Sequence, residues 1–135
     1  MSNALYDKGR EGFLDGSIDW DTDDIRVILV DTLDYTVNLA THQFLSDVPA
    51  AARVAVSGAL TGKTVAAGVA DAADVNFGNV TGDPSEALVI YQHTGVEGTS
   101  RLIAYIDTAT GLPVTPGGGP ITITWDNGGN KIFKL

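Results

Sequence analysis

The sequence predicts a mainly β protein, an antiparallel β-sandwich or barrel-like domain that begins with a short N-terminal helix. Three observations favour this class. Short β-branched runs recur along most of the chain, turn residues that include 16 glycines separate them, and the hydrophobic period changes from helical to strand-like after residue 16. We therefore expect one domain over residues 1–135, with a helix or arm at 1–15 and the β-sandwich at 16–135.

The first residues predict a helix over positions 3–14. Ser2 or Asn3 can cap it, because a short polar side chain accepts a hydrogen bond from the free N–H groups of the first turn. Gly9 and Gly12 would each weaken this helix by roughly 1 kcal/mol relative to alanine. The helix is therefore expected to need a surface on which to dock, either on its own domain or on a neighbour.

Three apolar side chains of this helix, Leu5, Tyr6 and Phe13, share one face at near-helical spacing. One hypothesis is that this face is an interface that docks on a neighbouring chain. The other is that the helix covers one open end of its own sandwich. The sequence leaves both open, and we take these three residues as the candidate interface.

Three nearly continuous apolar runs predict strands. Residues 25–31 (IRVILVD) and 86–92 (EALVIYQ) are expected to be covered on both faces, because their apolar residues do not alternate with polar ones. Residues 101–107 (RLIAYID) are expected to pair with the second run across the polar loop 94–100. This is the strongest hairpin signal in the chain.

The stretch between the first two runs predicts small elements. Residues 53–82 contain many alanines, but their glycine spacing and β-branched residues predict a meander of short strands, not helices. Before it, residues 41–48 are expected to form one turn of helix. Thr41 would cap this turn, Phe44 and Leu45 would be buried, and Pro49 would end it.

The C-terminal part predicts a loop followed by a last hairpin. Residues 111–120 (GLPVTPGGGP) cannot form a regular element, since three prolines lack N–H donors and four glycines are costly to order. Alternation over residues 121–125 predicts a strand with Trp125 facing inward. Residues 126–130 are rich in turn formers, and residues 131–135 are expected to close the hairpin.

Aspartates cluster between Ile18 and Ile25 and raise the question of a calcium site. In an EF-hand loop that begins at Asp19, the oxygen ligands at positions 1, 3 and 5 would fit. Position 6 needs glycine and position 12 needs glutamate. The chain has Asp24 and Val30 at those positions, so the sequence excludes an EF-hand.

A different cation site, built from Asp19, Asp21 and Asp23, stays open on sequence grounds. The period-two alternation favours another interpretation, in which Ile18 and Trp20 point inward and the aspartates point outward. We therefore expect a turn that leads into a strand, and no metal site.

The composition excludes several classes of partner. The chain carries 17 acidic and 8 basic residues, a net charge of −9. This field would repel nucleic acids, whose binding depends on neutralised phosphates, and anionic membrane surfaces. The chain has no cysteine, no secretory signal at its start and no apolar run that could cross a bilayer. We expect no nucleic-acid partner and no membrane partner.

No set of residues predicts catalysis. Neither His42 nor His93 lies in the glycine-flanked pattern of a nucleophile elbow, and the three glutamates are scattered. The three glycines at 117–119 lack the lysine and the helix of a phosphate loop. We expect no enzyme activity, no catalytic residue and no cofactor, with a small hydrolase or isomerase that uses aspartates as an alternative.

Three stretches resemble a family of small virion proteins of tailed bacteriophages. They are residues 3–32 (NALYDKGREGFLDGSIDWDTDDIRVILVDT), 41–55 (THQFLSDVPAAARVA) and 102–135 (LIAYIDTATGLPVTPGGGPITITWDNGGNKIFKL). The resemblance covers most of the chain. The glycine tract departs from the more polar loop of that family.

The resemblance implies a non-enzymatic structural protein, a decoration or cement protein that stabilises the capsid shell. The alternative is a part associated with the tail or a fibre, including a carbohydrate- or receptor-binding module. The implied partners are the major capsid protein or other virion proteins, and a homo-oligomer such as a trimer that matches local threefold axes. The implied location is the virion, after synthesis in the host cytoplasm.

Overall fold

The computed structural model describes residues 4–125, 128–129 and 131–135. Its helical elements are α1 (Asp7–Asp15) and two short 3-10 turns, η1 (Leu45–Asp47) and η2 (Ala50–Ala52). Its strands are β1 (Ala4–Leu5), β2 (Ile25–Val30), β3 (Arg53–Val56), β4 (Thr64–Ala66), β5 (Val69–Asp71), β6 (Val75–Asn79), β7 (Ala87–Gln92), β8 (Leu102–Ile106), β9 (Pro120–Ile123) and β10 (Phe133–Lys134).

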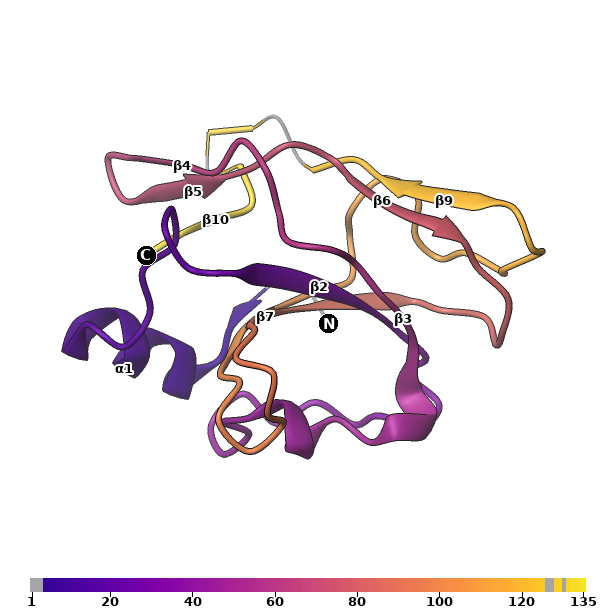
Figure 1. The fold of residues 1–135 in the computed structure, drawn as a ribbon, viewed down its shortest axis with the longest axis horizontal. Helices are drawn as coiled ribbons and strands as arrows, with labels where there is room; N and C mark the ends of the chain where they lie inside the picture. The colour runs from indigo at the N-terminus through magenta and orange to yellow at the C-terminus, as the bar shows by residue number, and fades with distance from the viewer. Residues whose placement is uncertain (1–3, 126–127, 130) are drawn as a thin grey trace.

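The strands form three antiparallel sheets. The large sheet has the order β1-β8-β7-β2-β3, a second has the order β10-β5-β4, and a third pairs β6 with β9. The two small sheets lie over one face of the large sheet, and the segment 31–52 with its 3-10 turns lies against the other face (Figure 1). The mainly β, sandwich-like fold with one N-terminal helix is the class that the sequence predicts.

The central strands are buried on both faces, which explains why their sequences do not alternate. In β2, Val27 and Leu29 belong to the core beneath the small sheets, whereas Ile28 and Val30 belong to the core beneath the segment 31–52. β7 pairs with β2 and with β8 over most of its length. The predictions for these three strands, and for the β7–β8 hairpin, are confirmed.

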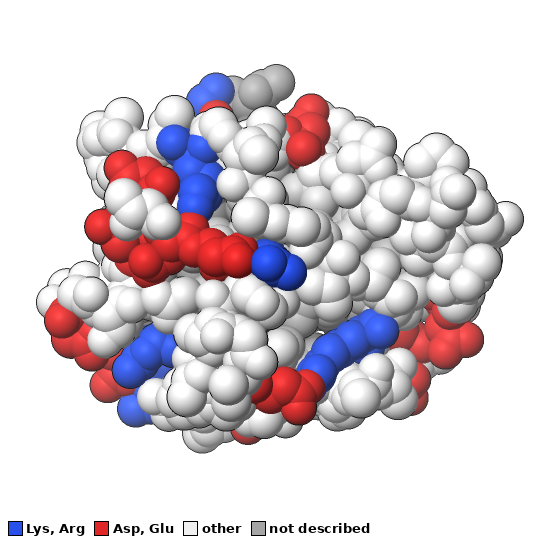
Figure 2. All heavy atoms as spheres, viewed as in Figure 1, with Lys and Arg blue, Asp and Glu red and all other residues white. Residues whose placement is uncertain are grey.

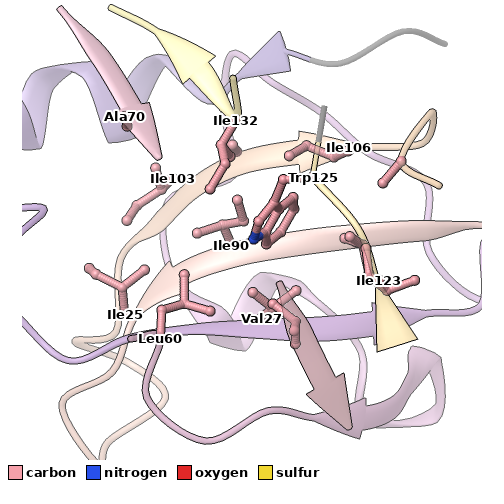
Figure 3. Packing of buried hydrophobic residues seen from close by; sticks show 14 of the residues in the cluster. Ile25, Val27, Leu60, Ala70, Ile90, Ile103, Ile106, Ile123, Trp125 and Ile132 are labelled. Atoms are coloured by element: carbon pink, nitrogen blue, oxygen red, sulfur yellow. The ribbon is translucent and has the colours of Figure 1, made fainter. Parts of the chain in front are cut away.

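The core beneath the small sheets surrounds Trp125, whose ring lies among aliphatic side chains of several strands in Figure 3. Its indole N–H donates to the backbone oxygen of Ala73, 3.0 Å away. Trp20 makes the equivalent bond to the oxygen of Asp71, also at 3.0 Å. Both tryptophans are therefore core residues, as the alternating pattern predicts, and each indole has its polar group satisfied.

The N-terminal helix begins later than predicted. Ala4 and Leu5 pair with β8 as a short strand, and Tyr6 is the residue that precedes the first turn of α1. Pairing with β8 satisfies the backbone of these residues, so they have no need of a helical turn. The proposed caps at positions 2 and 3 lie outside the described residues. The helix ends at Asp15 and is followed by Gly16, whose φ of 83° is the left-handed conformation typical of a helix stop.

Gly9 allows α1 to lie directly on β8. A Cβ atom at this position would lie 2.8 Å from the backbone oxygen of Leu102 and 2.9 Å from that of Ile103. Such contacts are closer than van der Waals distance, so only glycine fits without a shift of the backbone. The residue that weakens the isolated helix is thus the one that permits its docking surface.

The small strands pair differently from the prediction. The stretch 53–82 does form short strands, but β3 pairs with β2 and β6 pairs with β9, while β4 and β5 form a hairpin with each other. β10 pairs with β5, so residues 131–135 do not close a hairpin with the strand before them. β9 pairs instead with β6. Most of the turn expected at 126–130 lies outside the described residues.

The predicted helical turn at 41–48 is a shorter 3-10 turn, η1. Leu45 is buried as expected, but Phe44 is only half-buried, and Asp47 replaces Thr41 as the capping residue. Its carboxylate accepts the backbone N–H groups of Gln43 at 2.7 Å and Phe44 at 3.0 Å. A carboxylate that satisfies two free N–H groups stabilises this turn better than a hydroxyl could.

Candidate functional site

The three predicted interface residues do not share an exposed face. Leu5 belongs to the core between the sheets, and Tyr6 has no exposed surface and belongs to the core on the opposite face. Phe13 is half-buried, with its ring centroid 5.9 Å from that of Phe133. The expectation that Leu5 and Tyr6 face a neighbouring chain is therefore corrected, because pairing at β1 places both side chains inside the domain.

Tyr6 instead begins a chain of hydrogen bonds. Its hydroxyl lies 2.8 Å from that of Tyr35, which lies 2.8 Å from Nδ1 of His42. The backbone N–H of Asn38 donates to the same Nδ1 at 3.3 Å. Nδ1 is thus an acceptor, so Tyr35 donates to His42 and Tyr6 donates to Tyr35.

Burial keeps both of these hydroxyl groups protonated. It raises the pKa of Tyr6 far above its usual range and the pKa of Tyr35 to about 12. A phenol that holds its proton at neutral pH acts as a hydrogen-bond donor and not as a base. These hydrogen bonds therefore connect the start of α1 to the segment 31–52.

His93 also contacts a tyrosine. Its Nδ1 lies 3.3 Å from the hydroxyl of Tyr91, and the two rings meet edge to face. Its backbone N–H donates to the oxygen of Asp24 at 2.7 Å, next to the start of β2. In the described structure both histidines thus have contacts that hold elements together.

The aspartates of the turn between α1 and β2 fall into two groups, and the first, Asp23 and Asp24, holds the turn in place. Asp23 accepts the backbone N–H of Asp19 at 2.8 Å and the side-chain amide of Gln92 at 2.7 Å, so it fixes the turn to β7. Asp24 forms a two-pronged pair with Arg26, with both distances 3.0 Å, and this pair lowers the pKa of Asp24. These two carboxylates serve the scaffold.

Asp19 and Asp21 are exposed on both sides of the buried Trp20, as the alternation predicts. Their side chains contact each other. A hydrogen bond from Asp21 lowers the pKa of Asp19, and the neighbouring Asp19 raises the pKa of Asp21. The two groups together therefore form a small acidic site on the surface.

A different set of carboxylates comes closer to metal-ligand geometry. Oxygen atoms of Asp31, Asp34 and Asp83 lie within 4.8 Å of one another, and this is the set of three acidic groups with such spacing in the described part of the chain. Oδ1 of Asp31 accepts the N–H of Leu33 at 2.9 Å, and the other two residues are exposed. We assign no ion to this cluster. The site considered for Asp19, Asp21 and Asp23 does not have this spacing.

An open apolar groove of about 300 Å³ lies between α1, the turn at 18–21, the β4–β5 hairpin and β10. Its apolar lining includes Phe13, Trp20, Val65, Ala70, Phe133 and Leu135, and we call it the apolar groove. The rings of Trp20 and Phe133 meet edge to face within it, with centroids 5.2 Å apart. Val65 and Leu135 remain more than half exposed. The groove is thus a hydrophobic surface that the chain itself leaves partly open.

The charge at this groove is acidic. Asp19 and Asp21 are the charged side chains among its described lining residues. Figure 2 shows acidic side chains gathered on this side of the molecule, over the turn between α1 and β2, with basic groups beside them. Lys63 donates to the backbone oxygen of Asp23 nearby, so its ammonium group is engaged with the turn.

The sequence offered little to reveal this groove. Phe133 and Leu135 flank Lys134, a pattern that predicts one apolar face on a terminal strand. The sequence predicts that this strand pairs with residues 121–125, whereas in the structure it pairs with β5. Phe13 was singled out, and it is the one predicted interface residue that lies at the groove.

Comparison with known proteins gives no identification. No protein-family description matches the chain, and no curated protein matches it. Within the described residues, α1 is the longest helix, and no helix has the length and apolar character needed to span a bilayer.

Proposed function

We propose that this protein is a non-enzymatic structural component of a bacteriophage particle, and that it decorates and stabilises the capsid shell as a cement protein. The three stretches that resemble the phage family supply β1, α1, β2, most of β3, β8, β9 and β10. They therefore supply strands to all three sheets. A decoration protein acts through the free energy of binding to the assembled shell and needs no chemical step.

The observation that carries the proposal is the way in which both described ends of the chain are held in the scaffold. β1 pairs with β8 at the edge of the large sheet, and β10 pairs with β5 in a small sheet. A domain fixed in this way loses little conformational freedom when it binds, so more of the contact energy contributes to affinity. Stiffness is the property that a protein needs if it is to hold neighbouring capsomers together.

The polar side chains of the interior support the same proposal. The hydroxyl of Ser57 accepts the N–H of Val27 at 3.0 Å, and the carboxylate of Glu86 accepts the N–H of Thr32 at 3.0 Å. These groups, like the tyrosine chain, satisfy backbone or side-chain partners across elements. We infer that the chemistry of the chain serves the scaffold and not a reaction.

A carbohydrate-binding module is the weaker alternative. Such modules use exposed aromatic rings as platforms for sugar faces. Trp20 and Trp125 are 3% and 4% exposed, and both point into the core. This burial favours the structural role.

The proposed partners are the major capsid protein and further copies of this chain, as a homotrimer. Because Leu5 and Tyr6 are buried, contact with the shell has to use other surfaces. Light scattering should give a mass three times the 14.1 kDa of one chain. A monomer that binds no shell would contradict the cement role.

Imaging of particles provides the direct test. We expect density for this protein on the outer surface of heads that are purified from the encoding phage. Particles made without the gene should release their genome at a lower temperature. Added protein should return this release temperature to that of the complete particles. Particles that contain no copy of the chain, or density confined to the tail, would contradict the proposal.

A further inference from the structure

The β4–β5 hairpin extends its apolar face beyond the core. Val65 in β4 lies directly opposite Ala70 in β5, so their side chains point to the same face of this sheet. Ala70 is 5% exposed and belongs to the core, whereas Val65 is 57% exposed. The apolar face of this sheet is thus covered at β5 but left exposed at the edge strand β4.

The floor of the apolar groove is aromatic and firmly held. Trp20 is fixed by its bond to the oxygen of Asp71, and Phe133 lies edge-on to it on the paired strand β10. The volume of about 300 Å³ is at the lower end of the range of roughly 300–1,000 Å³ that small-ligand sites occupy. An open site of this size suits one or two aliphatic side chains of a partner better than an enclosed small molecule.

The charges favour a basic occupant. Asp19 and Asp21 repel each other at the rim of the groove, and a cation placed between them would remove that repulsion. A second copy of this chain would bring a further net charge of −9 to the same place. A lysine or arginine beside an apolar anchor therefore complements both properties of the groove.

We propose that the apolar groove docks a segment of a partner protein that inserts one or two aliphatic side chains over Val65 and Phe133 and places a lysine or arginine against Asp19 and Asp21. Where the partner is concerned, this inference rests on the proposed function, because in a phage head the segment would belong to the shell protein. The groove itself is tested without any particle, so failure of one proposal is distinguishable from failure of the other.

The test uses the full-length protein and labelled short peptides in a glycine–serine background. The basic apolar peptides carry two leucines flanked by lysines, with the leucines spaced for an extended segment in one peptide and for a helix in the other. Matched peptides replace the lysines with glutamates or the leucines with serines. We expect saturable binding of one basic apolar peptide by fluorescence anisotropy, at least about tenfold weaker for either matched peptide.

Matched variants locate the site. Val65→Asp should weaken binding by at least about tenfold, because it places a charge on the apolar face. Val96→Asp is the control, since Val96 is 59% exposed in the loop before β8 and does not line the groove. It should change affinity less than about twofold. Asp21→Asn should weaken binding about threefold at low salt and reduce its salt dependence.

Three outcomes would overturn the inference. One is the absence of saturable binding of either basic apolar peptide up to about 1 mM, a level that corresponds to roughly −4 kcal/mol. Another is equal weakening by Val65→Asp and Val96→Asp, which would show binding to the overall charge alone. The third is self-association by light scattering that Val65→Asp abolishes, without peptide binding, which would assign the groove to a second copy.

Discussion

The large sheet and the β4–β5–β10 sheet use similar residues but differ in how they are covered. Val27 in β2 has no exposed surface, because strands flank it on both sides and cores cover both faces. Val65 in β4 is the same residue type in an antiparallel strand, yet it lies on an edge and remains 57% exposed. The comparison teaches that position in the sheet, more than residue type, separates the scaffold from the surface that is open for recognition.

Substitution of each of these two valines by alanine should give the largest difference in stability. Val27→Ala removes two buried methyl groups and leaves a cavity, which should lower the free energy of unfolding by about 2–3 kcal/mol. Val65→Ala should lower it by less than about 0.5 kcal/mol, because its methyl groups are largely in water. Urea unfolding at neutral pH measures both. Equal losses would mean that β4 is covered in solution.

The contact of α1 with β8 gives the next largest effect. Gly9→Ala should destabilise the protein by about 1–3 kcal/mol, although alanine favours the helix, because the new Cβ would meet backbone atoms of β8. Gly98 is the control, since a Cβ there meets nothing within 4 Å. Gly98→Ala should be close to neutral. A stabilised Gly9→Ala variant would show that α1 does not lie against β8.

The hydrogen-bond chain on the covered side predicts an asymmetry between two tyrosines. Tyr35→Phe leaves the buried hydroxyl of Tyr6 without its acceptor and should cost about 1–2 kcal/mol. Tyr6→Phe removes a donor only, and Tyr35 still donates to His42, so its cost should be smaller. Thermal unfolding of both variants gives the comparison, and the reverse order would contradict the inferred donor direction.

The smallest predicted effects are changes in stability of opposite sign at two aspartates of one turn, Asp24 and Asp21. Arg26 lowers the pKa of Asp24, so this carboxylate stabilises the fold above its unfolded pKa of about 3.9, and the contribution is lost as the pH falls through the lower folded value. Asp24→Asn should therefore lower the free energy of unfolding at pH 7, measured by urea unfolding, by no more than a few tenths of a kcal/mol, because solvent screens the pair. At acid pH, where both forms are neutral, the difference should vanish.

Asp21 should respond in the opposite direction. Its pKa is raised by Asp19, so its contribution to stability is present below the unfolded pKa and is lost as the pH rises through the folded value. Asp21→Asn should thus raise the urea midpoint at pH 7, where the wild-type carboxylates repel each other. Changes of the same sign in the two variants would contradict the division of this turn into a scaffold part and a groove part.

The features that could be predicted from the sequence are those that depend on local patterns. The nearly continuous apolar run at 25–30 indicates a strand covered on both faces, and β2 is one. Alternation around Trp20 and Trp125 indicates which side chains point inward, and both are buried. Each of these inferences needs only the geometry of a single strand.

The features that could not be predicted depend on long-range pairing. Nothing near Phe133 specifies that β10 pairs with β5, and the apolar groove exists only because it does. Leu5 has helical spacing with its neighbours, but an available edge of β8 draws it into a strand. The cluster of Asp31, Asp34 and Asp83 likewise forms only when distant loops meet. A local pattern gives the direction of a side chain but not the identity of its neighbour.

The antiparallel pairing of β1 with β8 has a consequence for the order in which the protein forms. Leu5 leaves the ribosome about a hundred residues before its partner Ala104. Until then β1 has no strand to pair with, and the edge of β7 that pairs with β8 stays open. Such high contact order slows folding, so we expect this protein to fold after synthesis and to be most vulnerable to proteases and aggregation while it is still emerging.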